Sequence, residues 1–426
     1  MRSLTPRARG TRESLIILIG TNFAMGAIGL ITSRLALQLL GPSGRGELAA
    51  IQNVSLLLAV VGGAGMADAA LYFTAQRPGD IAPIVDRALR VALISSALVT
   101  VVAVSIIPLL LDGDSVRDAQ MFAPIIIAIA LLAVLHQPLR AIGQLEVWSI
   151  FRAGPAIAWV SILVVAWLSD YDDPFGLAIA FLLAHVVLVF AGMLLRMLYP
   201  HVEGRDGADS PPGRVMLRYG LPSGLVGVPQ VLNLRVDQVV MGWAVARSDL
   251  GLYATAVAWS TIVAPVFIGL GQLLVPRLAS IIHIDEQRRV VRRALIVTLS
   301  AAIAMAVVGV PLTHVALPLL LGDSVRPVVD VGQLLLVAGC ISGVQLVLGE
   351  IHRGLGRPRV SLIAECIGLC ATAVCLAVLL PRYGLTGAAV SSIISYSIVV
   401  LALLIPLRRL RGSRQRVLHE TGSAVR

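Results

Sequence analysis

The sequence predicts an all-α polytopic membrane protein with about twelve transmembrane helices in two parallel-repeat six-helix bundles. Hydrophobic residues make up 57% and charged residues 14% of its 426 residues, which is more apolar surface than one soluble core could bury. Apolar segments of about 20 residues, the length that crosses a bilayer, recur along nearly the whole chain. These segments leave no room for a soluble catalytic domain.

The predicted spans form two sets of six. In the first half they cover residues 15–40, 47–76, 90–111, 120–139, 147–168 and 175–198, and in the second half 215–243, 250–276, 294–321, 328–352, 360–380 and 385–407. The polar segment HVEGRDGADSPPGR separates the halves. We therefore expect an N-terminal six-helix bundle at 1–200, a cytoplasmic linker at 201–214, a C-terminal six-helix bundle at 215–411 and a basic cytoplasmic tail at 412–426.

The basic residues indicate the topology. All 34 are arginines, and they cluster in short segments between spans, including one expected loop at residues 288–293. With the N-terminus inside, the arginines expected outside are Arg45, Arg117, Arg247, Arg326 and Arg382, and those within spans are Arg34, Arg152 and Arg235. The rest fall on the cytoplasmic side, which predicts cytoplasmic termini. This bias explains the net charge of +10 better than nucleic-acid binding does.

An internal repeat relates the two halves. Residues 108–117 read PLLLDGDSVR and residues 318–326 read PLLLGDSVR, so they differ by one inserted aspartate. Six spans per half is an even number, so both halves insert with the same orientation. A parallel repeat about an axis along the membrane normal is typical of alternating-access transporters.

The first span of the second half has the composition of a bent helix. Pro222 and Pro229 each remove a helical hydrogen bond, and several glycines accompany them. Arg235 and Asp237 follow at membrane depth, where an ionisable residue is costly and by default functional. The alternative for Arg235 is a side chain that snorkels to the interface.

The repeat aligns Arg34 of the first span with Arg235 of the seventh. Glycine- or proline-interrupted spans at corresponding positions of two halves indicate a transporter's binding site. Two guanidinium groups that face one cavity would bind an anion such as a diphosphate, because the planar fork matches phosphate oxygens. Alternatively, each arginine pairs with an acid in its own half.

Other polar residues in spans are candidates for the cavity or for coupling. Asp237 shares a helix face with Gln230 and Ser223, which predicts a polar seam, and cation or proton coupling is the alternative. Asp68 and Glu365 are expected to line an inner vestibule, whereas Arg152 is expected to snorkel from the start of its helix. No catalytic, metal-binding or cofactor motif is present.

Five motifs carry a family resemblance. They are SRLALQLLGPSGRGELAA, LRVDQVVMG followed by SDLGLYATA, LLVPRLA, RGLGRP and PRYGLTGAAVSS. The chain resembles the polysaccharide-transport branch (O-antigen/oligosaccharide flippases) of the multidrug/oligosaccharidyl-lipid/polysaccharide exporter superfamily. The resemblance implies a V-shaped transporter with a central cationic cavity. By motif position Arg34 and Arg235 match cavity arginines, and Arg152, Asp68, Asp237 and Glu365 are carried over with them.

The resemblance implies a membrane flippase and not an enzyme. It would translocate polyprenyl-diphosphate-linked oligosaccharide or polysaccharide repeat units, of the undecaprenyl diphosphate type, across the bacterial plasma (inner) membrane by alternating access during envelope polysaccharide synthesis. Membrane lipids, and a polysaccharide polymerase or glycosyltransferases, are the other expected partners, with no cofactor and no nucleic acid. Two alternatives stay open, namely a cation- or proton-coupled multidrug exporter of the same fold and a membrane scaffold of an envelope synthesis complex.

Overall fold

The computed structural model describes residues 10–111, 113–198, 211–233, 236–237, 240–241, 247–321 and 323–407. These residues are almost entirely helical, and no strand occurs among them. They form two compact units. The first comprises Met1–Leu232, Pro265–Ser280 and Arg353–Leu362, and the second comprises Asn233–Ala264, Ile281–His352 and Ile363–Arg426, within the described ranges.

Helices of membrane-spanning length confirm the predicted fold class. Ten helices in the described ranges are long and apolar enough to cross a membrane. One of them, Pro358–Leu407, covers the last two predicted spans. The predicted span at 215–243 is not among the ten, because it is divided into shorter helices and includes residues outside the described ranges.

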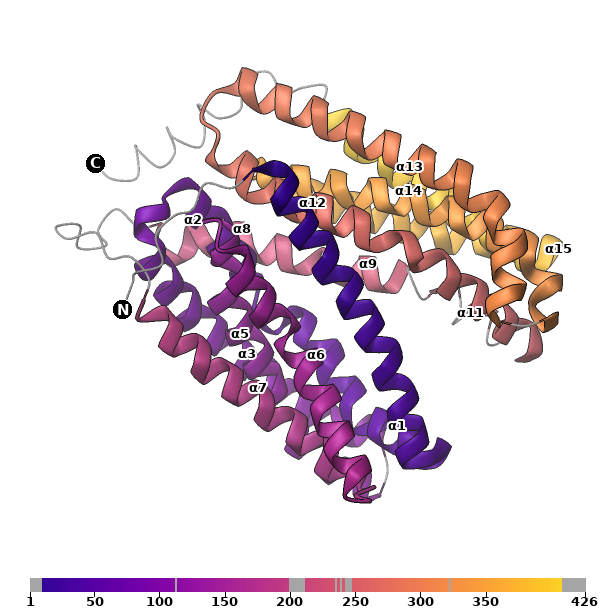
Figure 1. Ribbon diagram of the computed structural model, residues 1–426. Coiled ribbons are helices and arrows are strands. Elements are labelled where there is room, and N and C mark those ends of the chain that lie inside the picture. The colour runs from indigo at the N-terminus through magenta and orange to yellow at the C-terminus, as the bar shows by residue number, and fades with distance from the viewer. Residues whose placement is uncertain are drawn as a thin grey trace. The chain divides into compact units, whose positions relative to one another are not determined.

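The first unit is built around four long helices, α1, α3, α6 and α7, which pack side by side with the shorter α5 (Figure 1). The bounds of its helices are α1 Thr11–Gly62, α2 Met66–Gln76, η1 Pro78–Asp80, α3 Ile81–Leu110, α4 Asp114–Phe122, α5 Ile125–His136, η2 Gln137–Arg140, α6 Leu145–Leu168, α7 Pro174–Arg196, α8 Gly213–Leu225, α9 Gly227–Asn233 and α12 Ala264–Ser280. Trp148 and Phe122 are among its largest fully buried side chains. Large apolar side chains such as Leu109 are exposed on its outer surface, as expected for a surface covered by lipid.

The backbone breaks once within α1 and again between α1 and α2. Gly41 has φ 65° and ψ −179°, and it separates the two predicted spans that α1 contains. A second break follows at Ala64 and Gly65, both at positive φ, before α2 begins. A Cβ on Gly65 would lie 1.8 Å from the backbone oxygen of Gly220, so the turn before α2 packs directly against the backbone of α8.

The opening segment of the second half is interrupted as predicted. Helix α8 ends at Leu225 and α9 begins at Gly227, with Val226 between them. Pro222 lies inside α8, and Pro229 lies inside α9 and cannot donate to the preceding turn.

The second unit contains α11 Arg247–Ser260, η3 Thr261–Val263, α13 Ile284–Leu321, η4 Asp323–Val328 and most of α14 Val329–Gly354 and of α15 Pro358–Leu407. The last two residues of α14 and the first five of α15 belong to the first unit. Within α15, Gly384 at φ 55° and ψ −135° marks the boundary between the last two predicted spans. Helix α13 begins ten residues earlier than predicted. The expectation of a loop at residues 288–293 was wrong, because these residues lie in the first turns of α13. The arginines mark the end of the apolar span, but the helix continues through them.

Candidate functional site

A cavity of about 220 Å³ opens in the first unit, and every residue that lines it belongs to that unit. The end of α1, the start of α2, the middle of α5, the α8–α9 junction and the end of α14 surround it. Most of the wall is apolar. The polar side chains that line the cavity are Asp68, Ser223, Gln230 and Arg353.

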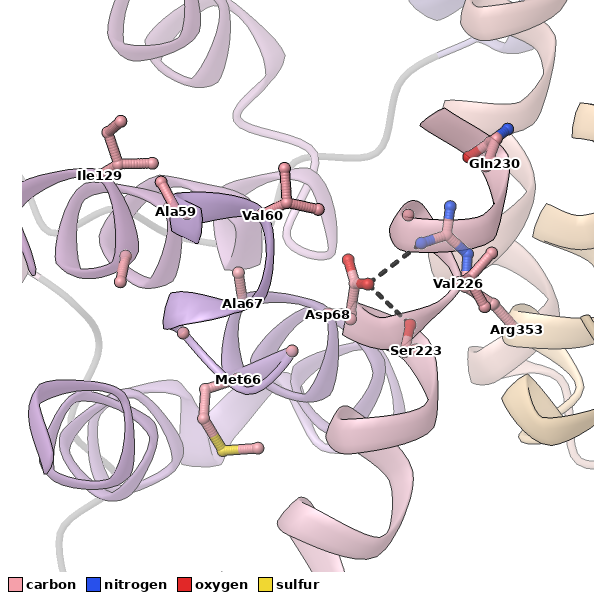
Figure 2. Close-up of a pocket in the computed structure, with 16 residues that line it drawn as sticks. Ala59, Val60, Met66, Ala67, Asp68, Ile129, Ser223, Val226, Gln230 and Arg353 are labelled. Carbon is pink, nitrogen blue, oxygen red and sulfur yellow. Dashed lines mark hydrogen bonds and ion pairs between the residues drawn. The ribbon is translucent and has the colours of Figure 1, made fainter. Parts of the chain in front are cut away.

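Asp68 is the centre of the polar part of the cavity, as Figure 2 shows. It lies in the first turn of α2, and its Oδ2 accepts a hydrogen bond of 2.6 Å from the Ser223 hydroxyl and one of 3.0 Å from the Arg353 guanidinium. The Asp68 and Arg353 side chains are only 27% and 23% exposed. Arg353 therefore compensates the negative charge of Asp68, and Ser223 satisfies part of its remaining hydrogen-bonding capacity.

Arg353 is held at the cavity by an aromatic cluster. The Tyr219 hydroxyl donates to the backbone oxygen of Arg353 at 2.8 Å, and the Tyr219 ring stacks on Tyr72 with centroids 4.3 Å apart. Gly356 has φ 75°, and a Cβ there would lie 2.4 Å from the Tyr72 hydroxyl. The glycine of the RGLGRP motif thus permits the tight turn that brings Arg353 to Asp68.

A second polar cluster surrounds Trp148, which is fully buried. The guanidinium carbons of Arg140 and Arg152 lie 5.6 Å and 5.5 Å from the centre of the Trp148 ring. Arg140 donates to the side chain of Gln137 at 3.0 Å and to the backbone oxygen of Gln272. Two cations thus share one aromatic ring in the interior of the unit, which is a favourable cation–π arrangement when desolvated.

Arg152 has no hydrogen bond in the described part of the chain, whereas Arg140 donates through its two terminal nitrogens. The Nε atoms of both arginines and Nε1 of Trp148 are buried without a hydrogen-bond partner. In the described part of the chain no carboxylate forms an ion pair with Arg152. The guanidinium lies over the Trp148 ring of its own helix, one turn away, so the side chain packs against the protein where snorkelling was expected. Three buried N–H donors around Trp148 are therefore available to an anion or to water.

The acids of the second unit form separate buried contacts. Asp237 accepts a hydrogen bond of 2.7 Å from the Tyr253 hydroxyl, and Glu365 accepts from Gln345 at 2.8 Å on each carboxylate oxygen. Asp237 and Glu365 are 6% and 3% exposed. Both are therefore interior carboxylates, and a neutral donor is among the partners of each.

The residues grouped with Asp237 as one polar seam fall in different units. Ser223 and Gln230 line the first-unit cavity, whereas Asp237 belongs to the second unit. Ser223 instead donates a hydrogen bond to Asp68. The sequence predicted an inner vestibule for Asp68 but no partner.

Of the predicted pair Arg34 and Arg235, only Arg34 lies among the described residues. Arg34 is exposed on α1, between the buried residues Thr32 and Ala36, and Arg235 lies outside the described residues. Their approach across the repeat stays a prediction. As for metals, the described residues contain no group of three or more His, Cys, Asp or Glu side chains that could hold a metal ion.

Comparison with known proteins places the fold. No family model matches the sequence, and no curated protein matches it. The chain is similar to an outward-facing multidrug resistance MATE family transporter of the MOP superfamily, with a TM-score of 0.76, 14% identity, and coverage of 93% of this chain and 95% of that one. It is also similar to the MATE transporter ClbM in complex with Rb+, with a TM-score of 0.71, 14% identity and 99% coverage of both chains.

A third similar structure is a MOP superfamily transporter from Pyrococcus furiosus, with a TM-score of 0.72 and 13% identity over 94% of this chain and 96% of that one. The protein is therefore an all-helical polytopic membrane protein. It has the fold of the MATE transporters.

Proposed function

We propose that the protein is a flippase that exports a polyprenyl-diphosphate-linked oligosaccharide or polysaccharide repeat unit. The observation that carries the proposal is the charge balance inside the first unit. Asp68 is compensated by Arg353, whereas Arg152 lies beside Arg140 with an unsatisfied Nε and no described carboxylate partner. An interior with surplus guanidinium charge favours an anionic head group over a cationic drug.

The fold supports a transporter, and the resemblance of the motifs supports the branch. The similar transporter from Pyrococcus furiosus is described as having a binding pocket of reverse polarity that suggests a different function. A MATE-like fold with reversed pocket polarity is consistent with a cargo of opposite charge. For this chain the proposed cargo is a lipid-linked diphosphate of the undecaprenyl type, with the head group in the cavity and the lipid tail in the bilayer.

The proposed setting follows from that cargo. Lipid-linked repeat units are assembled at the cytoplasmic face of the bacterial inner membrane, so the protein is expected there with both termini in the cytoplasm. A polysaccharide polymerase or glycosyltransferases are the expected neighbours in envelope polysaccharide synthesis. The arginines expected to meet the diphosphate are Arg34, Arg235 and Arg152.

Variants of Arg152 test the proposal in proteoliposomes that carry a fluorescent polyprenyl-diphosphate glycan. Arg152→Gln should slow translocation roughly ten- to a hundredfold, because a charge-assisted hydrogen bond contributes about 1.5–3 kcal/mol. Arg152→Lys should recover part of the rate, since it keeps the charge and loses the fork. Arg90→Gln, which removes an exposed arginine from α3, is the matched control. A wild-type rate in Arg152→Gln would remove this residue from the site.

A second candidate function is a cation- or proton-coupled multidrug exporter. The observation that favours it is that Asp237 and Glu365 are buried acids in the second unit. Under this function Asp237→Asn would abolish gradient-driven export of a cationic dye, while Arg152→Gln would leave it unchanged. Under the flippase proposal Arg152→Gln should reduce translocation of the glycan more than Asp237→Asn does. If the wild-type protein moves neither the glycan nor the dye, the scaffold alternative is favoured.

A further inference from the structure

The first three turns of α13 carry a concentrated positive charge at the end of a membrane-spanning helix. Arg288, Arg289, Arg292 and Arg293 are all exposed there. Arg288 and Arg292 are four residues apart, as are Arg289 and Arg293, so the four side chains lie on one side of the helix. Gln287 and Val291 lie on the opposite face and are buried at 8% and 4% exposure. The cluster is thus fixed with its arginines facing outward.

The nearby acids compensate only part of this charge. Asp285 pairs with Arg288 at 3.4 Å, and Glu286 is exposed one turn before the later arginines. In the described ranges no carboxylate forms an ion pair with Arg289, Arg292 or Arg293. Three guanidinium groups therefore present their donors outward.

The same helix face continues as a stripe of exposed apolar side chains. The stripe follows Arg292 at steps of four, three, four and four residues. Its members and their exposed fractions are Ile296 54%, Leu299 48%, Ile303 63% and Val307 68%. Because exposed apolar side chains of this density on a spanning helix face lipid tails, the arginines one turn away lie at the level of the head groups.

We propose that Arg289, Arg292 and Arg293 bind the head group of an anionic phospholipid in the leaflet at this end of α13. The guanidinium fork matches a phosphodiester, and the apolar stripe below receives the acyl chains. The positive-inside rule accounts for arginines at this end of the helix but does not require them on the lipid-facing side. Their register with the stripe is what indicates a lipid-binding site.

The test is lipid retention by the full-length protein, measured by native mass spectrometry during titration with phosphatidylglycerol. Wild type should retain phosphatidylglycerol over phosphatidylcholine. The variant Arg289→Gln/Arg292→Gln/Arg293→Gln should weaken retention on the order of ten- to a hundredfold, because each arginine near an anionic surface contributes a similar share of the binding free energy. The charge-matched control is Arg90→Gln/Arg117→Gln/Arg382→Gln, which removes three exposed arginines elsewhere and should retain the lipid.

Three outcomes would overturn the proposal. One is equal retention by the α13 variant and wild type, and another is equal loss in the control variant. The third is displacement of phosphatidylglycerol by inorganic phosphate at matched concentration, which would indicate a simple phosphate site. If the triple variant does not fold, Arg292→Gln is measured alone, and unchanged retention there also contradicts the proposal.

Discussion

The ion pair between Asp68 and Arg353 should stabilise the first unit measurably. At 3.0 Å the gross attraction between the charges is about 5 kcal/mol at an effective dielectric constant near 20. Desolvation removes much of this attraction. Exposed pairs contribute about 0–1 kcal/mol, and loss of one partner of a buried pair costs about 3–5 kcal/mol. Both side chains are about one quarter exposed, so we expect a coupling free energy of about 2 kcal/mol.

The measurement is a double-mutant cycle on the free energy of unfolding, with Asp68→Asn, Arg353→Gln and their combination in reversible denaturation from mixed micelles. Arg353→Gln alone should cost more than the coupling, because Arg353 has other interactions. The cycle removes that contribution.

The control cycle uses the exposed pair of Asp285 and Arg288, which are 82% and 44% exposed at 3.4 Å. It should give about 0.3 kcal/mol. A coupling for Asp68 and Arg353 no larger than this value would show that the two residues do not act as a pair. Ser223→Ala should cost about 1–2 kcal/mol, since it removes a hydrogen bond to a charged acceptor.

Three further predictions follow from the backbone, the topology and the arginine pair. Gly65→Ala should destabilise the protein by about 3 kcal/mol or more, because Gly65 has a positive φ and a Cβ there would lie against the Gly220 carbonyl. Gly26→Ala, with open space around it, should be neutral or slightly stabilising. Thermal denaturation in detergent distinguishes the two variants. Cysteine labelling should find Ser115→Cys and Ser324→Cys on the same outer side of the membrane, and labelling on opposite sides would contradict the parallel repeat. Arg34→Ala/Arg235→Ala should fail to complement a flippase deletion at wild-type protein levels, and full complementation would exclude the arginine pair as the anion site.

Apolar periodicity and charge bias predicted the helices well, because a span needs about 20 apolar residues and arginines remain at the ends. They placed the break at Gly41 between two spans and the interruption near Pro222, since glycine and proline act on the local backbone. They misplaced the start of α13, because an exposed amphipathic extension has no apolar signal.

The site was harder to predict than the fold. Asp68 was a candidate, but its partner Arg353 is 285 residues away, and no local pattern reports such a contact. The packing of Arg152 on Trp148 was also missed, although the spacing of four residues on one helix was visible. The missing signal was burial, which depends on the helices packed around Trp148.

The central claim is that the cargo is anionic, and substrate charge tests it most directly. Purified protein in proteoliposomes is given a polyprenyl-diphosphate glycan and, in parallel, a cationic dye, with an uncharged polyprenyl glycan as the control lipid. We predict translocation of the diphosphate-linked glycan alone, with inhibition by excess polyprenyl diphosphate. Transport of the cationic dye without transport of the diphosphate-linked glycan would contradict the claim and identify a drug exporter.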